Sequence, residues 1–396
     1  MDFLPFFLVL LVGIVFSSVF RRFHLPWVVA LMMGGIIVGP YGVGWVETTD
    51  TISFLGQVGL VLLMFMAGLE TKLSSFEKLD SNTIALALVN GLLPFGVGFG
   101  IGLIFEFGFV PSALLGIVFV SSSIAVIVPT LESRGVLGSR LGRTILSAAI
   151  IEDVASLIFL SILFQTIEPT TSLPLPVFYL LLFAVLVTFR RLLPVLQLFF
   201  SPSDGGPSKD IFQRDVRVIF VLLTGTVISF ELLGLHPIIA GFFAGLVLSD
   251  SIRSEVLIEK LRTLSYGVFI PIFFVVLGME TDISVFSAVG GAIVLTGAVL
   301  LGSILSKFIS GWLGGRIAGF RGRESLVVGA ATIPQLSTTL AVVFSGLQSG
   351  LFDQRLVAAM IVLSIVTTVL APMLITYFMA QPKIQLSRKR FGEPRA

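Results

Sequence analysis

The sequence predicts an all-α integral membrane protein with about thirteen transmembrane helices. Of its 396 residues, 56% are hydrophobic and only 12% are charged, whereas soluble domains carry about 25% charged residues. Apolar runs of about 20 residues, the length that crosses the hydrocarbon core, recur along the whole chain. Basic residues follow every second run. The chain contains no cysteine, which excludes disulfides, thiolate metal sites and thiol redox chemistry.

Each predicted helix is an apolar run bounded by polar or turn-forming residues. The first run ends in Arg21-Arg22 and has no basic segment before it. This is the reverse of the charge order of a signal peptide, so we count the run as a helix. Arg190 and Arg191 interrupt the seventh run, whose end is therefore the least defined. The predicted spans are 3–20, 26–44, 51–70, 82–106, 112–131, 139–165, 174–198, 212–234, 236–250, 264–280, 285–314, 323–346 and 354–380.

The distribution of basic residues tests this helix count and predicts an orientation. Loops after odd-numbered spans, together with the C-terminal tail, hold 23 of the 25 Lys and Arg residues. The loops on the other side hold only Arg355, and Lys307 lies within a span. Cytoplasmic loops are the ones enriched in Lys and Arg. We therefore expect the N-terminus outside, the C-terminus in the cytoplasm, and a bacterial-type inner (plasma) membrane.

Two segments of the first half reappear in the second half at one spacing. Leu25-Pro26 at the start of the second span matches His236-Pro237 at the ninth, an offset of 237 − 26 = 211. Gly68-Leu69-Glu70-Thr71 matches Gly278-Met279-Glu280-Thr281, an offset of 278 − 68 = 210. The shift advances seven helices, and because seven is odd the two copies cross the membrane in opposite directions. Inverted repeats of this kind are a secondary-transporter architecture.

The repeat predicts one transmembrane transporter domain over 1–396. We expect a first inverted repeat at 1–165, a linker helix and cytoplasmic loop at 166–211, and a second repeat at 212–381. A short basic cytoplasmic tail at 382–396 follows, with no soluble regulatory domain. Each repeat has six helices.

The fifth and twelfth spans, which the shift superimposes, both combine hydroxyl side chains with a proline in mid-membrane. One contains Ser121-Ser122-Ser123 and Pro129, the other Thr332, Pro334 and Gln335. Proline removes a backbone donor and frees a carbonyl one turn back. Matching interruptions indicate two discontinuous helices that cross at an ion site. The alternative is a pair of ordinary proline kinks packed by small residues.

Three charges lie deep in apolar helices, where each costs at least about 2.5–3.5 kcal/mol. Glu152 and Asp153 lie in the sixth span and Lys307 in the eleventh. Adjacent helical residues point about 100° apart, so only one of the two carboxylates can pair with Lys307. We expect Glu152 to be the partner and Asp153 to face a cavity. The alternative is a buried ion pair that only joins two helices.

These motifs resemble the monovalent cation:proton antiporters, in particular the Kef-type and bacterial sodium/proton branch of the second antiporter family. The resemblance rests on Gly68-Leu69-Glu70, the serine-rich fifth span, Glu152-Asp153, and Lys307 with the glycines that follow it. It implies a homodimer and a core that moves like an elevator. It also implies that Asp153 binds the ion and the proton and that Lys307 is the core lysine. The chain departs from the family pattern at Glu152 and Gln335.

The sequence therefore predicts an antiporter of Na⁺ or K⁺ against protons, with no cofactor. Cation and proton would compete for Asp153, with oxygen atoms of Ser122, Ser123 and Thr332 completing an alkali-cation site. Two alternatives remain open, a Kef-like potassium efflux pathway and a sodium-coupled symporter of an organic anion. An enzyme is disfavoured, because the sequence has no metal-ligand cluster, nucleophile elbow or phosphate-binding glycine loop.

Overall fold

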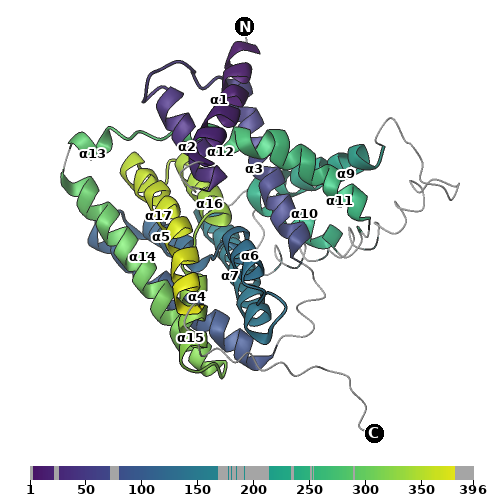
Figure 1. Cartoon of the computed structure of the whole chain (residues 1–396). Coiled ribbons are helices and arrows are strands. Elements are labelled where there is room, and N and C mark those ends of the chain that lie inside the picture. The colour runs from purple at the N-terminus through teal and green to yellow at the C-terminus, as the bar shows by residue number, and fades with distance from the viewer. Residues whose placement is uncertain are drawn as a thin grey trace, which may run out of the picture.

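The computed structural model consists of helices joined by short connections (Figure 1). It describes residues 3–21, 26–71, 80–167, 214–232, 236–249, 252, 254–288 and 290–379, together with four isolated positions between 177 and 191. The uninterrupted helices are α1 (Phe3–Arg21), α2 (Trp27–Val38), α3 (Asp50–Glu70), α4 (Ser81–Ile104), α7 (Arg140–Ile167), α9 (Arg214–Leu232), α10 (Pro237–Ser249), α14 (Gly290–Ile317) and α17 (Gln354–Met379).

Twelve of the thirteen predicted spans coincide with described helices, while the seventh, 174–198, and the tail at 382–396 fall outside the described residues. Within the described part, nine helical stretches are long and apolar enough to cross a membrane, and α2 and α10 are shorter apolar helices. The predicted all-α membrane architecture is therefore confirmed. The total number of helices stays a prediction.

Two membrane-crossing segments are broken in the middle, at the positions that the sequence marks. α5 (Phe109–Val120) and α6 (Ile124–Ser133) are separated by three serines at 121–123. α15 (Arg323–Thr332) and α16 (Ser337–Gln348) are separated by residues 333–336. Each break leaves the last carbonyls of one half-helix and the first N–H groups of the next without helical partners. These groups are therefore free to bind side chains from elsewhere.

The tenth predicted span begins earlier than expected. α11 (Glu255–Leu264) leads through a π-helical turn, η2 (Ser265–Phe269), into α12 (Ile270–Met279), so Lys260 and Arg262 lie on a helix and not in a loop. The sequence of α11 does not form a continuous apolar run, because charged and apolar residues are interspersed along this amphipathic helix. Pro271 cannot donate to the carbonyl of Gly267, and the wider turn before it accommodates the missing bond.

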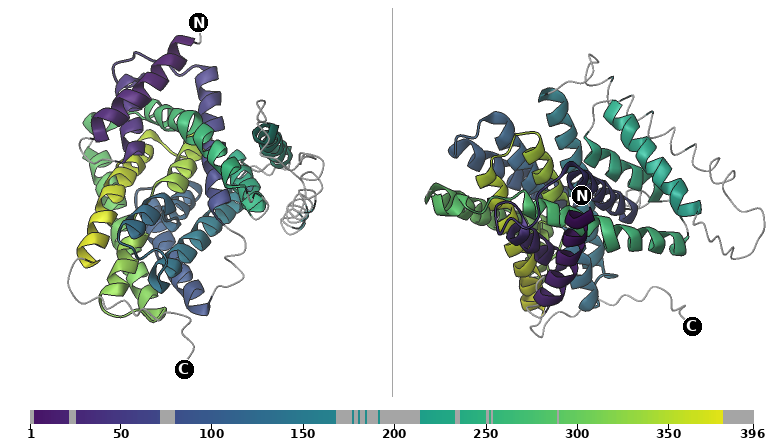
Figure 2. Two further views of the ribbon diagram at one scale, coloured as in Figure 1. Left: turned by 45° about the vertical axis from the view of Figure 1, so that its right-hand side comes forward. Right: turned by 90° about the horizontal axis from the view of Figure 1, so that it is seen from above.

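The helices pack as two groups, and in Figure 1 α9, α10 and α11 of one group lie to the right of α14 and α17 of the other (see also Figure 2). The panel group contains α1, α2, α3, α9, α10, α11, η2 and α12. The crossing group contains α4, α5, α6, α7, α14, α15, α16 and α17, with the short α13 (Val285–Ala288) attached. Extensive helix–helix contacts lie within each group. Between helices of the two groups, the most extensive contact in the described part is that of α16 with α3.

Glycines hold the panel group together by very close backbone contacts. At five glycines, a Cβ atom would lie 2.1–2.2 Å from a carbonyl oxygen of the facing helix, and four of these contacts form two pairs. A shift of 210 residues, which exchanges the two halves, turns the contact at Gly35 into the contact at Gly245. The same shift turns the contact at Gly68 into the contact at Gly278. This is the pattern that an inverted repeat produces. The paired contacts are Gly35 with Val275, Gly245 with Phe65, Gly68 with Phe242 and Gly278 with Met32, and the fifth is Gly59 with Phe269.

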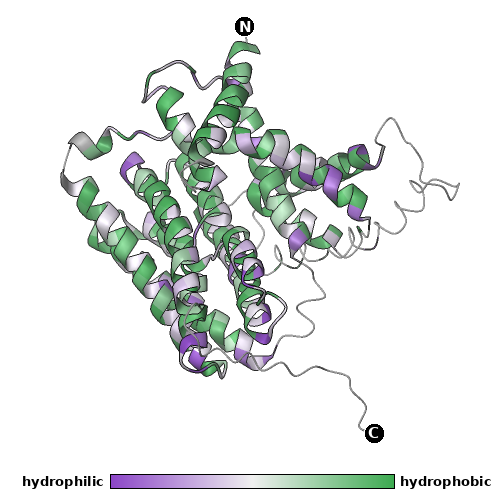
Figure 3. Cartoon of the chain, in the orientation of Figure 1, coloured by the Kyte–Doolittle hydropathy of each residue, from purple (hydrophilic) through white to green (hydrophobic). Residues whose placement is uncertain are grey.

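The outer surface suits a bilayer, with polar residues gathered at the helix ends (Figure 3). Large apolar side chains such as Leu92 and Leu301 are 63% exposed in mid-helix, where lipid would cover them. At one end, basic loops meet. Arg140 Nη2 donates to Ala318 O at 2.8 Å, and Arg134 Nη2 donates to Thr376 Oγ1 at 2.9 Å.

Candidate functional site

Two adjacent carboxylates of α7 lie where the broken helices cross, and they have opposite environments. Glu152 is 1% exposed and Asp153 is 6% exposed, so neither charge is solvated by bulk water. Because they are neighbours on one helix, their side chains point to different sides of α7. What each carboxylate contacts therefore separates their functions.

Glu152 uses both of its oxygen atoms in close polar contacts. Its Oε2 lies 3.0 Å from Lys307 Nζ and accepts a hydrogen bond from Ser122 Oγ at 2.7 Å. Its Oε1 accepts from Asn90 Nδ2 at 2.7 Å. These donors come from α14, the break after α5, and α4. A buried carboxylate with three charged or polar donors is fully compensated and has little capacity left for a ligand.

Lys307 is completely buried and has a second partner besides Glu152. Its Nζ donates to Val120 O at 2.6 Å. Val120 is the last residue of α5, and the terminal carbonyls of a helix carry a partial negative charge. The break after α5 thus supplies an acceptor that an unbroken helix would use internally. The ammonium group joins α14, α7 and α5.

A further pair of polar residues, which sequence reasoning missed, supports this ion pair. Ser310 Oγ donates to Asn90 Oδ1 at 2.7 Å, so the Asn90 amide is held with its nitrogen toward Glu152. Both are fully buried. Asn90 is a polar residue within the apolar fourth span, and Ser310 lies one turn beyond Lys307. These two features of the sequence could have identified Asn90 and Ser310 as members of the site.

Backbone and hydroxyl contacts join the two breaks directly. Ser123 N donates to Pro334 O at 2.7 Å, and Ser122 Oγ lies 3.1 Å from Thr332 O. Ser121 and Thr339 share a hydrogen bond of 3.0 Å between their hydroxyl groups. The expected discontinuous positions Pro334 and Gln335 lie in the second break. Pro129, by contrast, lies inside α6 and not in the first break.

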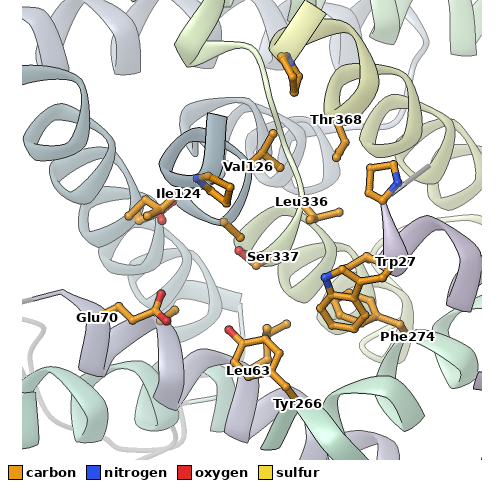
Figure 4. A pocket seen from close by; sticks show the side chains of 17 residues that line it. Trp27, Leu63, Glu70, Ile124, Val126, Tyr266, Phe274, Leu336, Ser337 and Thr368 are labelled. Atoms are coloured by element: carbon orange, nitrogen blue, oxygen red, sulfur yellow. The ribbon is translucent and has the colours of Figure 1, made fainter. Parts of the chain in front are cut away.

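Asp153 is the carboxylate that the crossing leaves uncompensated. Its Oδ1 is buried and has no hydrogen-bond partner in the described part of the chain, while the Thr338 side chain and the Ser122 backbone face the carboxylate. Asp153 lines a cavity of about 300 Å³ between the two helix groups. In Figure 4, Trp27, Tyr266 and Phe274 of the panel group face Ile124, Leu336 and Ser337 of the crossing group.

The other oxygen atoms predicted for the cation site lie in different surroundings. The Thr332 hydroxyl donates to Lys307 O and to Gly329 O, both at 2.9 Å, and Ser122 Oγ serves Glu152. These two hydroxyls therefore belong to the network of the ion pair. Ser123 Oγ is buried and has no hydrogen-bond partner among the described residues, and the same holds for Asp153 Oδ1 and for Oε1 of Gln335, which the sequence predicts only as a position in the helix break. All three are hard oxygen atoms, the ligand type that alkali and alkaline-earth cations prefer.

Comparison with known proteins shows the family of this chain. The model of the family described as sodium/hydrogen exchanger, transmembrane, matches residues 6–381. The chain belongs to the sodium/hydrogen exchanger family. It is therefore a member of the monovalent cation:proton antiporters, which are transporters and not enzymes.

Individual relatives match over nearly the full chain. The chain is 31% identical to the probable Na⁺/H⁺ antiporter 3 of Methanocaldococcus jannaschii, covering 94% of this chain and 95% of that one. It is 30% identical to a Na⁺/H⁺ antiporter of Enterococcus hirae, with 94% and 96% covered. The solved structure of the sodium proton antiporter MjNhaP1 from M. jannaschii superposes with a TM-score of 0.66 at 16% identity, over 94% and 95% of the two chains. That likeness shows a shared fold.

Proposed function

We propose that this antiporter exchanges Na⁺ for protons by letting both compete for the Asp153 carboxylate. The observation that carries the proposal is the contrast between the two neighbours on α7. Glu152 has three donors, whereas Asp153 keeps an unpaired buried oxygen beside a cavity. A carboxylate in such a place is stable when it binds either a proton or a cation. Sodium is the cation that the names of both reported relatives give.

In this mechanism Glu152 and Lys307 form a brace. The ammonium group neutralises Glu152 and caps α5, so the break keeps its shape when Asp153 changes its occupant. Ser123 Oγ and Gln335 Oε1 are the candidates to complete the cation's oxygen shell. The proton needs no such shell, because protonation alone removes the charge of Asp153.

Movement of the crossing group against the panel group would carry Asp153 from one side of the membrane to the other. Two observations support such an elevator-like step. The groups have limited helix contact with each other, and the Asp153 cavity lies at their boundary. Because 1–165 and 212–381 would be inverted repeats, the same contacts can be exchanged between halves to expose the opposite side.

We place the basic loops in the cytoplasm of a bacterial-type inner membrane, with the N-terminus outside, and assign a homodimer as the working assembly. The orientation is supported by the 23 Lys and Arg residues on one side. The dimer assignment rests on the family resemblance.

The lining of the cavity favours cation exchange over symport of an organic anion. Its described lining contains two carboxylates, Asp153 and Glu70, and no basic side chain. Glu70 is paired with Arg262, so it is the Asp153 carboxylate that would repel an anion there. A potassium efflux pathway remains the second candidate, and it differs in needing no opposing proton flux.

The test is sodium-driven proton flux in proteoliposomes with imposed pH gradients. Asp153→Asn keeps the size of the side chain but removes its charge and its titrating proton, so we expect no flux. Glu152→Gln is the matched control, because its amide oxygen can still accept from Lys307 and Ser122, and it should retain exchange. Normal flux in Asp153→Asn would refute the proposal. Loss of flux in Glu152→Gln alone would reverse the assignment of the two carboxylates. Cation flux without any opposing proton flux would favour the efflux pathway.

A further inference from the structure

Two carboxylates outside the crossing terminate equivalent helices in the two halves. Glu70 is the last residue of α3, and Glu280 directly follows α12. In both places the next residue is a buried threonine whose hydroxyl donates to the carbonyl four residues back, at 2.9 Å for Thr71 and 2.7 Å for Thr281. The two helix ends are therefore built alike, 210 residues apart.

Each of these carboxylates lines a hollow, and the hollows lie at opposite ends of the panel helices. Glu70 lines the cavity that contains Asp153, where the start of α2, the end of α3 and η2 meet. Figure 4 shows its side chain in that cavity. Glu280 lines a separate hollow of about 310 Å³ formed by the opposite ends of α2, α12 and α16. The other residues of this second hollow are Pro40, Tyr41, Thr48, Met279, Leu347, Gln348 and Gln354.

We propose that Glu70 and Glu280 are paired entrance sites that concentrate the cation before it reaches Asp153, one for each direction of transport. The inference rests on the proposed role of Asp153 as the exchange site. A carboxylate at the mouth of a cleft raises the local concentration of cations and the rate at which they enter. The repeat supplies one such carboxylate for each mouth. In the orientation given above, Glu70 serves the cytoplasmic side and Glu280 the outer side.

The two entrances differ in one respect, which gives the proposal a second prediction. Arg262 Nη2 of α11 lies 3.5 Å from Glu70 Oε1, with side chains that are 56% and 42% exposed. An ion pair this exposed is weak, so a cation can displace the arginine. Among the described residues, no basic side chain lies within 4.0 Å of the Glu280 carboxylate. Arg262 therefore competes with the cation at the Glu70 entrance, and Glu280 has no described competitor of this kind.

The alternative role for Glu70 is to anchor α11 through Arg262. The two roles predict different changes in the KM for Na⁺. If the pair is only an anchor, removing either partner has the same effect. If Glu70 is an entrance site, Glu70→Gln weakens cation entry, whereas Arg262→Gln strengthens it.

The experiment measures initial rates of Na⁺/H⁺ exchange against Na⁺ concentration in right-side-out and everted membrane vesicles. Glu70→Gln should raise the KM for Na⁺ about threefold to tenfold when Na⁺ enters from the cytoplasmic side only, with Vmax changed less than twofold. Glu280→Gln should do the same from the outer side only. Arg262→Gln should lower the cytoplasmic KM, and Glu70→Asp, which keeps the carboxylate, should stay near wild type. High choline chloride should abolish these differences by screening.

Unchanged KM values from both sides, or equal changes from both sides, would overturn the proposal. A rise in KM in both Glu70→Gln and Arg262→Gln would show an anchor instead. Asp153→Asn in the same vesicles separates this result from the main mechanism. If Asp153→Asn is inactive and Glu70→Gln is normal, only the entrance sites are refuted. If Asp153→Asn transports normally, the exchange site itself is wrong.

Discussion

The panel helices and the crossing helices solve the same packing problem by opposite means. In the panel group, glycines remove side chains so that backbones approach until a Cβ would lie 2.1 Å from a carbonyl, as at Gly68. At the crossing, the backbones are interrupted and the gaps are filled by Lys307, Glu152 and Asn90. The first region gains stability from close apolar contact. The second depends on mutual compensation of buried charges, and the candidate exchange site, Asp153, lies there.

The difference between the two regions is what makes Asp153 the candidate exchange site. Of the three buried charged side chains at the crossing, Glu152 and Lys307 pair with each other, and Asp153 has no ion-pair partner among the described residues. The panel helices pack closely and symmetrically. The crossing holds the buried Asp153, whose charge a proton or a cation can neutralise.

The largest expected effect of substitution on stability is at the brace. Lys307→Ala leaves Glu152 charged and without its cation. It also removes the ammonium group that donates a hydrogen bond to Val120 O. Loss of one member of a buried pair costs about 3–5 kcal/mol, so thermal unfolding in detergent should shift strongly downward. Adding Glu152→Gln should recover a large part of that loss, because the side chain at position 152 is then neutral and needs no cation. An unshifted melting temperature in Lys307→Ala would show that the brace contributes no stability.

A smaller effect is expected at the panel. Gly68→Ala and Gly245→Ala would each push a methyl group into a facing carbonyl, at Phe242 and Phe65, and overpacking of this kind costs about 1–3 kcal/mol. Gly225→Ala on α9 is the control, because nothing lies within 4 Å of its Cβ position. Unfolding of the three variants should separate the first two from the third. Equal stability for all three would contradict the close glycine contacts.

Much of this difference could be predicted from the sequence. The depth of Glu152, Asp153 and Lys307 follows from counting residues along apolar runs. The offset of 210 between Gly68 and Gly278 also predicted which helices correspond. Both signals depend only on position along the chain, which the sequence records directly.

What could not be predicted depends on rotation of helices and side chains. Sequence reasoning gave the Ser122 and Thr332 hydroxyls to the cation, whereas in the structure they bind Glu152 and Lys307 O. Asn90 reaches Glu152 from 62 residues away, and no periodicity links the two. Pro129 has the residue type of a helix break, yet the three serines before α6 form the break instead. Such choices are settled by packing between segments far apart in the chain.

The most direct test of competition at Asp153 is proton release on addition of cation to the purified protein in weakly buffered detergent solution. If Na⁺ displaces a proton from Asp153, addition of NaCl to wild-type protein should acidify the solution, and addition of choline chloride should not. Glu152→Gln should still release protons, because in the wild-type protein the Glu152 carboxylate is paired with Lys307 and is not the group that exchanges the proton. Asp153→Asn should release none. Undiminished, sodium-specific proton release from Asp153→Asn would contradict the account.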